Sequence, residues 1–196
     1  MIKVLFFSSN QKKIEEVLKL FDKKKYDVLS LYNFSKFKEP IENGRTFEKN
    51  AFIKSSYGFK NYKIPCFADD SGICINALND KPGVQSKRFI EKNNGIENTF
   101  LKIINKAKKK NNYTAYFQTS ICLSLQNNKS VYFKGILKGN ISKEVRGLNG
   151  FGYDPIFIPI GYSKTLAEMS IKEKNKISHR SMAIHELKKY FKNLFI

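Results

Sequence analysis

Apolar residues along the first third of the chain alternate between short continuous runs and a helical spacing. Residues 3–7 form a short apolar run, which predicts a buried strand. Apolar residues then recur at 14, 17, 18 and 21, and this spacing predicts a helix. A second strand is predicted at 26–31, and a glycine-containing loop leads to a helix predicted at 46–59. The chain therefore begins as strand, turn and helix.

The next predicted strand, at 64–68, ends at two acidic residues. Asp69 and Asp70 follow it directly. After a serine and a glycine, an apolar run resumes extended structure at 73–75. The pattern therefore predicts two carboxylates at a point where a strand is interrupted.

The second half of the chain continues the alternation and adds a hairpin. The predicted elements, in chain order, are a helix at 96–107, strands at 113–125 and 130–137 joined by the turn 126–129, a strand at 156–158, and a final helix that Ser178 or Ser181 caps. Alternating helices and strands with a hairpin predict an α/β fold on a mixed sheet. We find no internal repeat, linker or low-complexity tail.

Length and composition are typical of a globular protein. The 196 residues predict a single domain over 1–196, and a hydrophobic content of 41% suffices for a core without metal or disulfide. No apolar stretch reaches the roughly 18 residues of a transmembrane helix. The apolar run at 4–7 is also too short for the core of a signal peptide. We therefore expect a cytoplasmic protein that does not enter a membrane.

The three cysteines do not form a metal or redox motif. Cys66, Cys74 and Cys122 are odd in number, lie far apart and have apolar neighbours. We therefore expect buried thiols outside any disulfide.

The chain carries a formal net charge of +19, from 36 basic and 17 acidic residues. Such a charge attracts polyanions, including nucleic acid. Lysine-rich runs such as 23–25 and 106–110, however, are typical of solvated helix ends and loops. The charge is therefore compatible with a small phosphorylated substrate and does not by itself select nucleic acid.

The polar turn after the first strand is the first candidate binding element. Ser8, Ser9 and Asn10 lie at the entrance of a predicted helix, and Lys13 follows in its first turn. Backbone N–H groups at a helix N-terminus carry partial positive charge and bind phosphate well. An ordinary helix cap explains the same residues without a ligand. The turn is therefore a candidate phosphate site that other motifs must support.

Asp69 and Asp70 form the second candidate. Carboxylates that emerge from an apolar strand are costly unless a cation compensates them, and Mg²⁺ prefers such oxygen ligands. Glu42, in the loop before the second predicted helix, offers a further carboxylate. For the acidic pair alone, a structural turn without metal is an equal alternative.

The third candidate is the glycine-rich segment 147–155. Its glycines let the backbone approach a ligand closely, and its two aromatic residues either stack on a base or fill the core. Further donors gather at the entrance of the final predicted helix: Lys174, Ser178, His179 and Arg180. His179 and His185 do not share a helix face, so the pattern does not favour zinc.

Five motifs in chain order resemble the inosine triphosphate pyrophosphatase family, whose members act on non-standard purine triphosphates. The matching segments are Ser8 to Lys13, Phe67 to Gly72, Leu78 to Phe89, Gly150 to Phe157, and Thr165 to Arg180. The resemblance runs from residue 8 to residue 183. Lys49 and Asp80 depart from the family pattern, but neither is a residue that we assign to chemistry.

The resemblance implies a fold, a reaction and a metal. The implied fold is an elongated mixed β-sheet with flanking helices and two lobes around a central active-site cleft, in a homodimer. The implied reaction cuts ITP, dITP or XTP between the α- and β-phosphates, giving monophosphate and pyrophosphate. Glu42 and Asp70 would hold Mg²⁺, with Asp69 as a third candidate ligand. Asp70 would also take the proton of the attacking water.

The same resemblance implies the substrate-binding residues. Ser8, Ser9, Asn10 and Lys13 would hold phosphates, and Lys54 and Lys174 would add positive charge. Phe151 would stack on the purine, while His179 and Arg180 would donate to its 6-oxo group. The remaining predicted substrate-binding residues are Ser71, Gly152, Tyr153 and Asp154.

Two other functions remain open from the sequence. A related pyrophosphatase with another base preference would keep the chemistry and change only the base pocket. A basic RNA-binding module would instead use aromatic and basic residues on a strand face, as at 113–117 and 131–134. Such a module has no use for Asp69 and Asp70 beside a phosphate turn. We therefore expect a nucleoside triphosphate, and not nucleic acid, as the partner.

Overall fold

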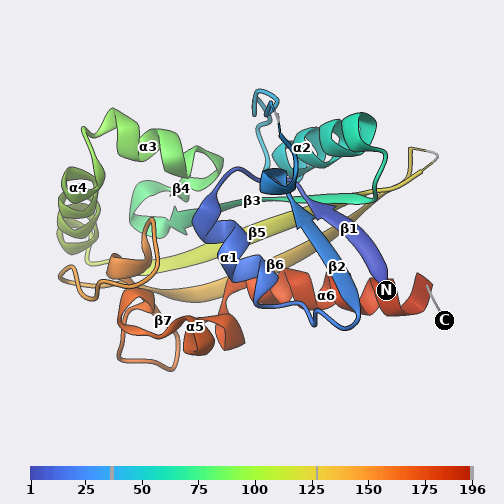
Figure 1. Ribbon diagram of the computed structural model, residues 1–196. Coiled ribbons are helices and arrows are strands. Elements are labelled where there is room, and N and C mark those ends of the chain that lie inside the picture. Colours follow the sequence, from blue (N-terminus) through green and yellow to red (C-terminus); the bar gives the residue numbers. More distant parts are fainter. Residues whose placement is uncertain (36–37, 127, 195–196) are drawn as a thin grey trace. The chain divides into compact units, whose positions relative to one another are not determined.

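The fold is given by a computed structural model, which describes residues 1–35, 38–126 and 128–194. Helices and strands alternate in the first part of the chain, and later helices and strands also follow one another directly (Figure 1). The strands are β1 (Ile2–Phe6), β2 (Tyr26–Ser30), β3 (Cys66–Ile75), β4 (Lys81–Pro82), β5 (Thr114–Ser124), β6 (Ser130–Ile141) and β7 (Phe157–Pro159). The α-helices are α1 (Gln11–Leu18), α2 (Phe47–Tyr62), α3 (Ser86–Lys92), α4 (Ile96–Lys109), α5 (Ile171–Ile177) and α6 (His179–Leu194).

The described strands form one sheet with both parallel and antiparallel pairs. Its order is β2-β1-β3-β5-β6-β7, and β4 pairs with β3 outside that path. β1 runs parallel to β2 and to β3, with Phe6 opposite both Ser30 and Phe67. β4 and β7 run antiparallel to β3 and β6. The predicted α/β fold on a mixed sheet is confirmed.

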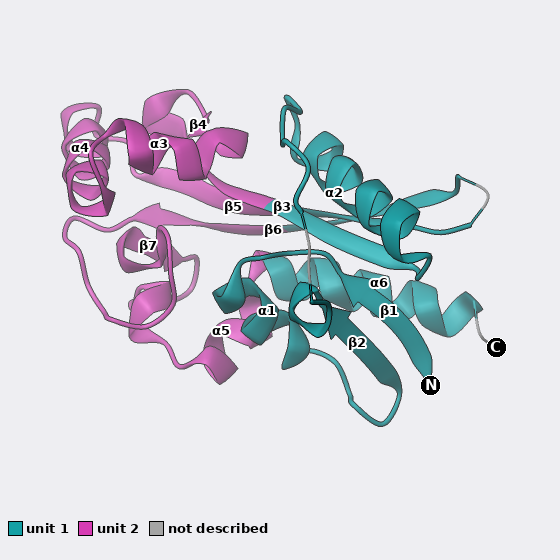
Figure 2. Ribbon diagram, turned by 45° about the horizontal axis from the view of Figure 1, so that its top comes forward, with its two compact units in different colours: residues 1–70, 119–135, 180–196 teal, residues 71–118, 136–179 magenta. Residues whose placement is uncertain are grey.

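The chain divides into two compact units (Figure 2). Unit 1 comprises residues 1–70, 119–135 and 180–196, and unit 2 comprises residues 71–118 and 136–179. Strands β3, β5 and β6 and helix α6 each contribute residues to both units. The single domain predicted over 1–196 stays a prediction.

The apolar run of β1 is buried on both faces of the sheet in unit 1. Val4 and Phe6 pack in a cluster with residues of α1 and α6. Leu5 and Phe7 pack in a second cluster, to which α2 contributes Tyr57. A strand covered on both faces reads as a continuous apolar run and not as an alternation, which is why residues 3–7 predicted it.

Unit 2 has a core of its own. Ile73 and Ile75 of β3 pack with Phe100 and Ile103 of α4 and with residues of β5, β6 and β7. The predicted helical stripe at 96–107 is therefore the buried face of α4, apart from Ile96 at its start, which is 38% exposed. Within the described residues, no helix has the length and apolar content that crossing a membrane requires.

The predicted break in the third strand is wrong. β3 runs from Cys66 to Ile75 without interruption, and Asp69 and Asp70 lie inside it. The two residues are only 1% and 8% exposed. Acidic residues usually end a buried strand because a buried charge is costly, but hydrogen bonds and ion pairs described below offset that cost here.

Other differences from the predicted elements are small. The sequence pattern did not predict α3 and α5, each of seven residues. β5 and β6 are neighbours in the sheet, and Leu125 donates its N–H to the carbonyl of Lys129 at 2.9 Å. Residue 127 of the predicted hairpin turn lies outside the described residues.

Candidate functional site

The polar turn between β1 and α1 has the geometry of a helix cap. Asn10 accepts a bond from the N–H of Lys13 at 3.1 Å through its side chain, and donates its own N–H to Ser8 Oγ at 3.2 Å. Ser9 donates its N–H and its hydroxyl to Glu39, at 3.0 Å and 2.6 Å. Two donors of the turn, both from Ser9, therefore already bind one carboxylate.

Asp69 lies in a buried network of charged side chains in unit 1. Lys13 Nζ is 3.1 Å from Asp69 Oδ2, and Arg180 donates Nε and Nη2 to the same oxygen at 3.2 Å. Arg180 also donates Nη1 to Glu16. The side chains of Arg180, Asp69 and Glu16 are at most 4% exposed. Because each charge is out of water, each depends on these partners.

The network sets the charge states of its two cations. Burial works against the charged form of Arg180, but Asp69 and Glu16 outweigh burial and raise the pKa of Arg180. Burial lowers the pKa of Lys13, and the opposing effect of Asp69 does not fully offset it. Lys13 is therefore the cation of the network that gives up its proton more easily.

Asp70, the next residue in β3, has different partners. Its Oδ2 accepts a bond of 2.9 Å from the side-chain amide of Asn50 on α2. Burial raises the pKa of Asp70, against the opposing effects of Lys54, Lys13 and the Asn50 bond. Asp70 is therefore a buried carboxylate that binds a proton more readily than an exposed aspartate does.

Glu42 contacts a buried lysine. Lys54 Nζ lies 2.9 Å from Glu42 Oε2, and the lysine side chain is 7% exposed while that of Glu42 is 38% exposed. Burial works against the charge of Lys54, but Glu42, Asp69 and Asp70 together outweigh it and raise the pKa of Lys54. Lys54 therefore stays charged beside the acidic residues.

The glycine-rich segment of unit 2 folds around a buried ion pair. Asp154 Oδ2 accepts a bond of 2.8 Å from the N–H of Phe151 and one of 2.7 Å from Lys174 Nζ. Lys174 Nζ also lies 4.7 Å from the centre of the Phe151 ring. A Cβ at Gly150, whose φ is 74°, would meet Asp154 Oδ2 at 2.2 Å. Only glycine therefore permits this turn around Asp154.

Tyr153 and His179 belong to the packed interior of unit 2. Tyr153 is 4% exposed, and its hydroxyl donates to the carbonyl of Ser86 at 2.8 Å. His179 is also 4% exposed and stacks on Phe117 with ring centres 4.7 Å apart. Ser71, the first residue of unit 2, is half-buried in β3.

Comparison with known proteins identifies the family. A model described as the Ham1 family matches residues 4–190. The chain belongs to the Ham1 family. This membership confirms the resemblance found in the sequence motifs.

Relatives of this Ham1 chain match it over almost their whole length. A dITP/XTP pyrophosphatase of Flavobacterium psychrophilum is 40% identical over 192 residues, which is 98% of this chain and 100% of the relative. A dITP/XTP pyrophosphatase of Borrelia duttonii is 41% identical over 199 residues, covering 96% and 97%. The structure of a HAM1 protein from Coxiella burnetii has a TM-score of 0.87 at 34% identity, covering 98% of this chain and 100% of that one.

Within the Ham1 fold, unit 1 collects the predicted phosphate and metal residues. The predicted site residues that lie in this unit are Ser8, Ser9, Asn10, Lys13, Glu42, Lys54, Asp70 and Arg180. Both oxygens of Asp69 contact Lys13, and one also binds Arg180, so its observed partners are cations of the chain. The guanidinium of Arg180 is directed to Asp69 and Glu16, and its predicted contact with a base stays a prediction.

Unit 2 holds the other predicted residues of this Ham1 protein: Ser71, Phe151, Gly152, Tyr153, Asp154, Lys174 and His179. Phe151 and Gly152 are only half-buried. Asp154 and Lys174 are buried against each other and hold the backbone of Phe151 in place. The assignment of these residues to substrate stays a prediction.

Sequence reasoning missed three residues that bind predicted site residues of unit 1: Glu16, Glu39 and Asn50. Glu16 lies three residues after Lys13, next to the apolar stripe of α1, and an acidic residue at that spacing from a candidate lysine is a detectable signal. Asn50 lies one turn inside α2, on its buried side. Glu39 has no local signal, because its partner Ser9 lies 30 residues earlier.

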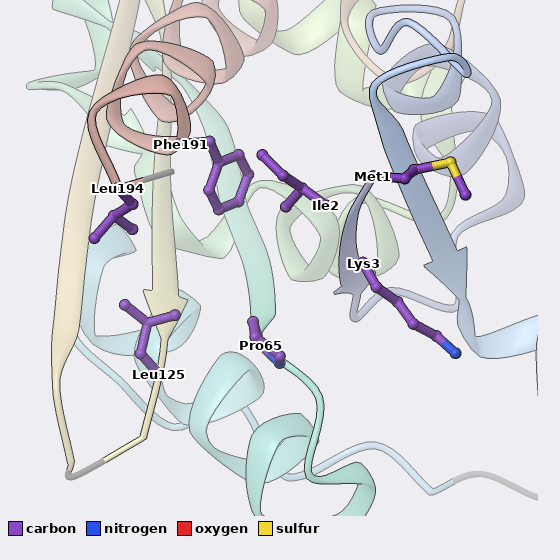
Figure 3. A pocket seen from close by; sticks show the side chains of 7 residues that line it. All are labelled: Met1, Ile2, Lys3, Pro65, Leu125, Phe191 and Leu194. Atoms are coloured by element: carbon purple, nitrogen blue, oxygen red, sulfur yellow. The ribbon is translucent and has the colours of Figure 1, made fainter. Parts of the chain in front are cut away.

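An apolar pocket of about 340 Å³ lies elsewhere in unit 1 (Figure 3). It is lined by Met1, Ile2, Lys3, Pro65, Leu125, Phe191 and Leu194. None of these residues is a predicted site residue. Lys3 is the only lining residue with an ionisable side chain. The pocket therefore lacks the carboxylates that the proposed proton transfer and metal binding require.

Among the described residues, no group of three or more His, Cys, Asp or Glu side chains is arranged to hold a metal ion. Glu42 and Asp70 nevertheless supply hard oxygen atoms of the kind that Mg²⁺ binds. Magnesium sites in nucleotide enzymes commonly use one or two carboxylates, with substrate phosphates and water completing the shell. The donor chemistry of this pair therefore fits Mg²⁺ bound together with a phosphorylated substrate.

Proposed function

We propose that this protein hydrolyses dITP, XTP and ITP to the nucleoside monophosphate and pyrophosphate. Relatives that match it over nearly their whole length are dITP/XTP pyrophosphatases. The observation that carries the chemistry is Asp70, a buried carboxylate held by Asn50 with a raised pKa. An acid with a raised pKa is a stronger base when ionised, which suits proton abstraction near neutral pH.

In this proposal Asp70 takes the proton of the water that attacks phosphorus. The bond between the water oxygen and the α-phosphorus forms as the bond to the pyrophosphate oxygen breaks. Asn50 orients Asp70 through its bond to Oδ2. Pyrophosphate then departs as the leaving group.

The turn of Ser8, Ser9 and Asn10 would hold the phosphate oxygens. The partial positive charge of a helix N-terminus favours an anion there. Lys13 and Lys54 add full positive charges as negative charge shifts to the leaving group. The buried chain of Asp69, Arg180 and Glu16 fixes the position of Lys13.

Glu42 and Asp70 would hold Mg²⁺. When bound, the ion would neutralise part of the negative charge on the phosphate oxygens, which otherwise disfavours attack by water. Lys54 contacts Glu42, so binding of the cation must compete with that ion pair.

For recognition of the purine, we propose Phe151 for stacking and His179 and Arg180 for the 6-oxo group. Support comes from the sequence resemblance, together with the half-buried position of Phe151, whose ring lies 4.7 Å from Lys174 Nζ. Donors aimed at a 6-oxo group leave an adenine amino group without a partner, which gives strong rejection. We also propose a homodimer, on the same resemblance, and a cytoplasmic location, on the lack of a long apolar stretch in the sequence.

Product analysis with a panel of triphosphates tests the function. Purified protein with Mg²⁺ should convert dITP, ITP and XTP to monophosphate and pyrophosphate, and should act slowly on ATP and CTP. Equal rates on ATP would end the argument for base recognition. Release of orthophosphate with diphosphate would show that the other bond is cut.

A further inference from the structure

Glu39 occupies donors in the turn that the proposed function assigns to phosphate. Ser9 donates its backbone N–H to Glu39 Oε1 at 3.0 Å and its hydroxyl to Oε2 at 2.6 Å. Here two donors of one residue bind two oxygens of one anion. A turn can bind a phosphate group in the same way. The carboxylate of Glu39 therefore stands where a phosphate would accept the same two bonds.

The loop that carries Glu39 contacts α2 at two further points, through Lys54 and Asn50. Three residues later, Glu42 pairs with Lys54 at 2.9 Å. Gly44 donates its N–H to Asn50 Oδ1 at 2.7 Å, and Asn50 is the residue that holds Asp70. Both acidic side chains of the loop thus contact groups that are proposed to bind phosphate.

The contact of Glu39 is of a kind that a substrate can displace. Both Ser9 and Glu39 reach solvent, so water can replace the bonds when they break. A triphosphate brings more negative charge than one carboxylate and would repel Glu39 as it enters the turn. Buried pairs such as Lys174 with Asp154 do not share this property.

We propose that Glu39 is an affinity-determining residue, an internal anion that binds Ser9 until a substrate phosphate displaces it. The inference rests on the proposed phosphate role of the turn. When a protein's own side chain occupies its binding site, ligand can bind only the molecules whose site is open. The apparent affinity is then the intrinsic affinity multiplied by the fraction of open sites. Removing Glu39 therefore strengthens phosphate binding, whereas a residue that merely shapes the turn would weaken it when removed.

Inorganic tripolyphosphate, titrated in EDTA by calorimetry, tests this without turnover or metal. Glu39→Ala should bind tripolyphosphate about fivefold more tightly than the original protein, on the scale of one exposed charged contact. Glu39→Gln, which keeps the shape and loses the charge, should lie between the two. The KM for dITP should fall by a similar factor in Glu39→Ala.

Glu15→Ala is the matched control, since it removes an equal charge from an exposed position on α1. It should change tripolyphosphate binding much less than Glu39→Ala does. Binding by Glu39→Ala that is equal, weaker or absent would overturn the inference, as would an equal gain in Glu15→Ala. If Glu39→Ala binds more tightly but the original protein releases no pyrophosphate from dITP, the inference stands and the proposed reaction fails.

Discussion

Asp69 and Asp70 are neighbours in β3, yet Asp69 pairs with two cations while Asp70 accepts a bond from a neutral amide. Asp69 receives the charged groups of Lys13 and Arg180, at 3.1 Å and 3.2 Å. Asp70 receives the neutral amide of Asn50 at 2.9 Å. Successive side chains of a strand point to opposite faces of the sheet, which is how adjacent carboxylates reach different surroundings. In the proposed function, the first positions Lys13 and the second takes the proton of the attacking water.

Replacing Asp70 by Asn should abolish most of the turnover. Asn keeps nearly the same volume but neither accepts a proton nor carries the charge for Mg²⁺. We expect turnover of dITP to fall by about a hundredfold or more, the scale of one positioned proton-transfer group. A folded Asp70→Asn protein with near-original turnover would end the proposed mechanism, and a thermal melt establishes that it is folded.

The same variant should be more stable than the original protein at neutral pH without metal. Burial raises the pKa of Asp70, so the native state binds the proton more tightly than the unfolded chain does. The resulting stabilisation is complete below the pKa of Asp70 in the unfolded state. It is lost as the pH rises through the pKa of Asp70 in the native state. At pH 7 the ionised Asp70 therefore costs stability, and Asn removes that cost. Melting temperatures in EDTA should show an advantage for Asp70→Asn at pH 7 that narrows towards pH 3; a lower melting temperature at pH 7 would contradict it.

Asp69→Asn should show the reverse pattern, with a large loss of stability. Lys13 and Arg180 would lose their shared counter-charge in a buried setting, and breaking a buried ion pair from one side costs about 3–5 kcal/mol. Turnover per folded molecule should fall less than in Asp70→Asn, because Asp69 acts through Lys13. Urea titration measures the first quantity and steady-state kinetics the second. A stable Asp69→Asn protein would show that the network does not hold the fold together.

Activity should require Mg²⁺ or a similar hard divalent ion. Glu42 and Asp70 offer two carboxylates, and the substrate phosphates would complete the coordination. Excess EDTA should remove activity and added Mg²⁺ should restore it. Full turnover in EDTA would refute the metal assignment while leaving the phosphate turn in place.

Thiol reagents should leave the native enzyme active. Cys66, Cys74 and Cys122 are all buried. Burial raises the pKa of Cys66 and of Cys122, so little of the reactive thiolate forms at neutral pH. Iodoacetamide should modify all three cysteines in urea and none in the native protein, as mass spectrometry will show. Inactivation that accompanies labelling of the native protein would disprove this.

Local pattern was sufficient for most elements of this fold. β1 was predicted because both of its faces are covered, which makes its sequence a continuous apolar run. α4 was predicted because only one of its faces is buried, so apolar residues recur at helical spacing. The break predicted in β3 was wrong because the energy of a buried carboxylate depends on its partners, and local pattern does not contain them.

The sequence by itself determined the α/β class, the family resemblance and which segments carry the acidic pair, the polar turn and the glycines. Only the tertiary structure decided what each polar group contacts. Arg180 reaches Glu16 across 164 residues, and Glu39 reaches Ser9 across 30. Such pairs carry no periodicity, because they are set by the path of the intervening chain and by which charges must be neutralised on burial. That is why two adjacent aspartates with the same local sequence signal have different partners and different proposed roles.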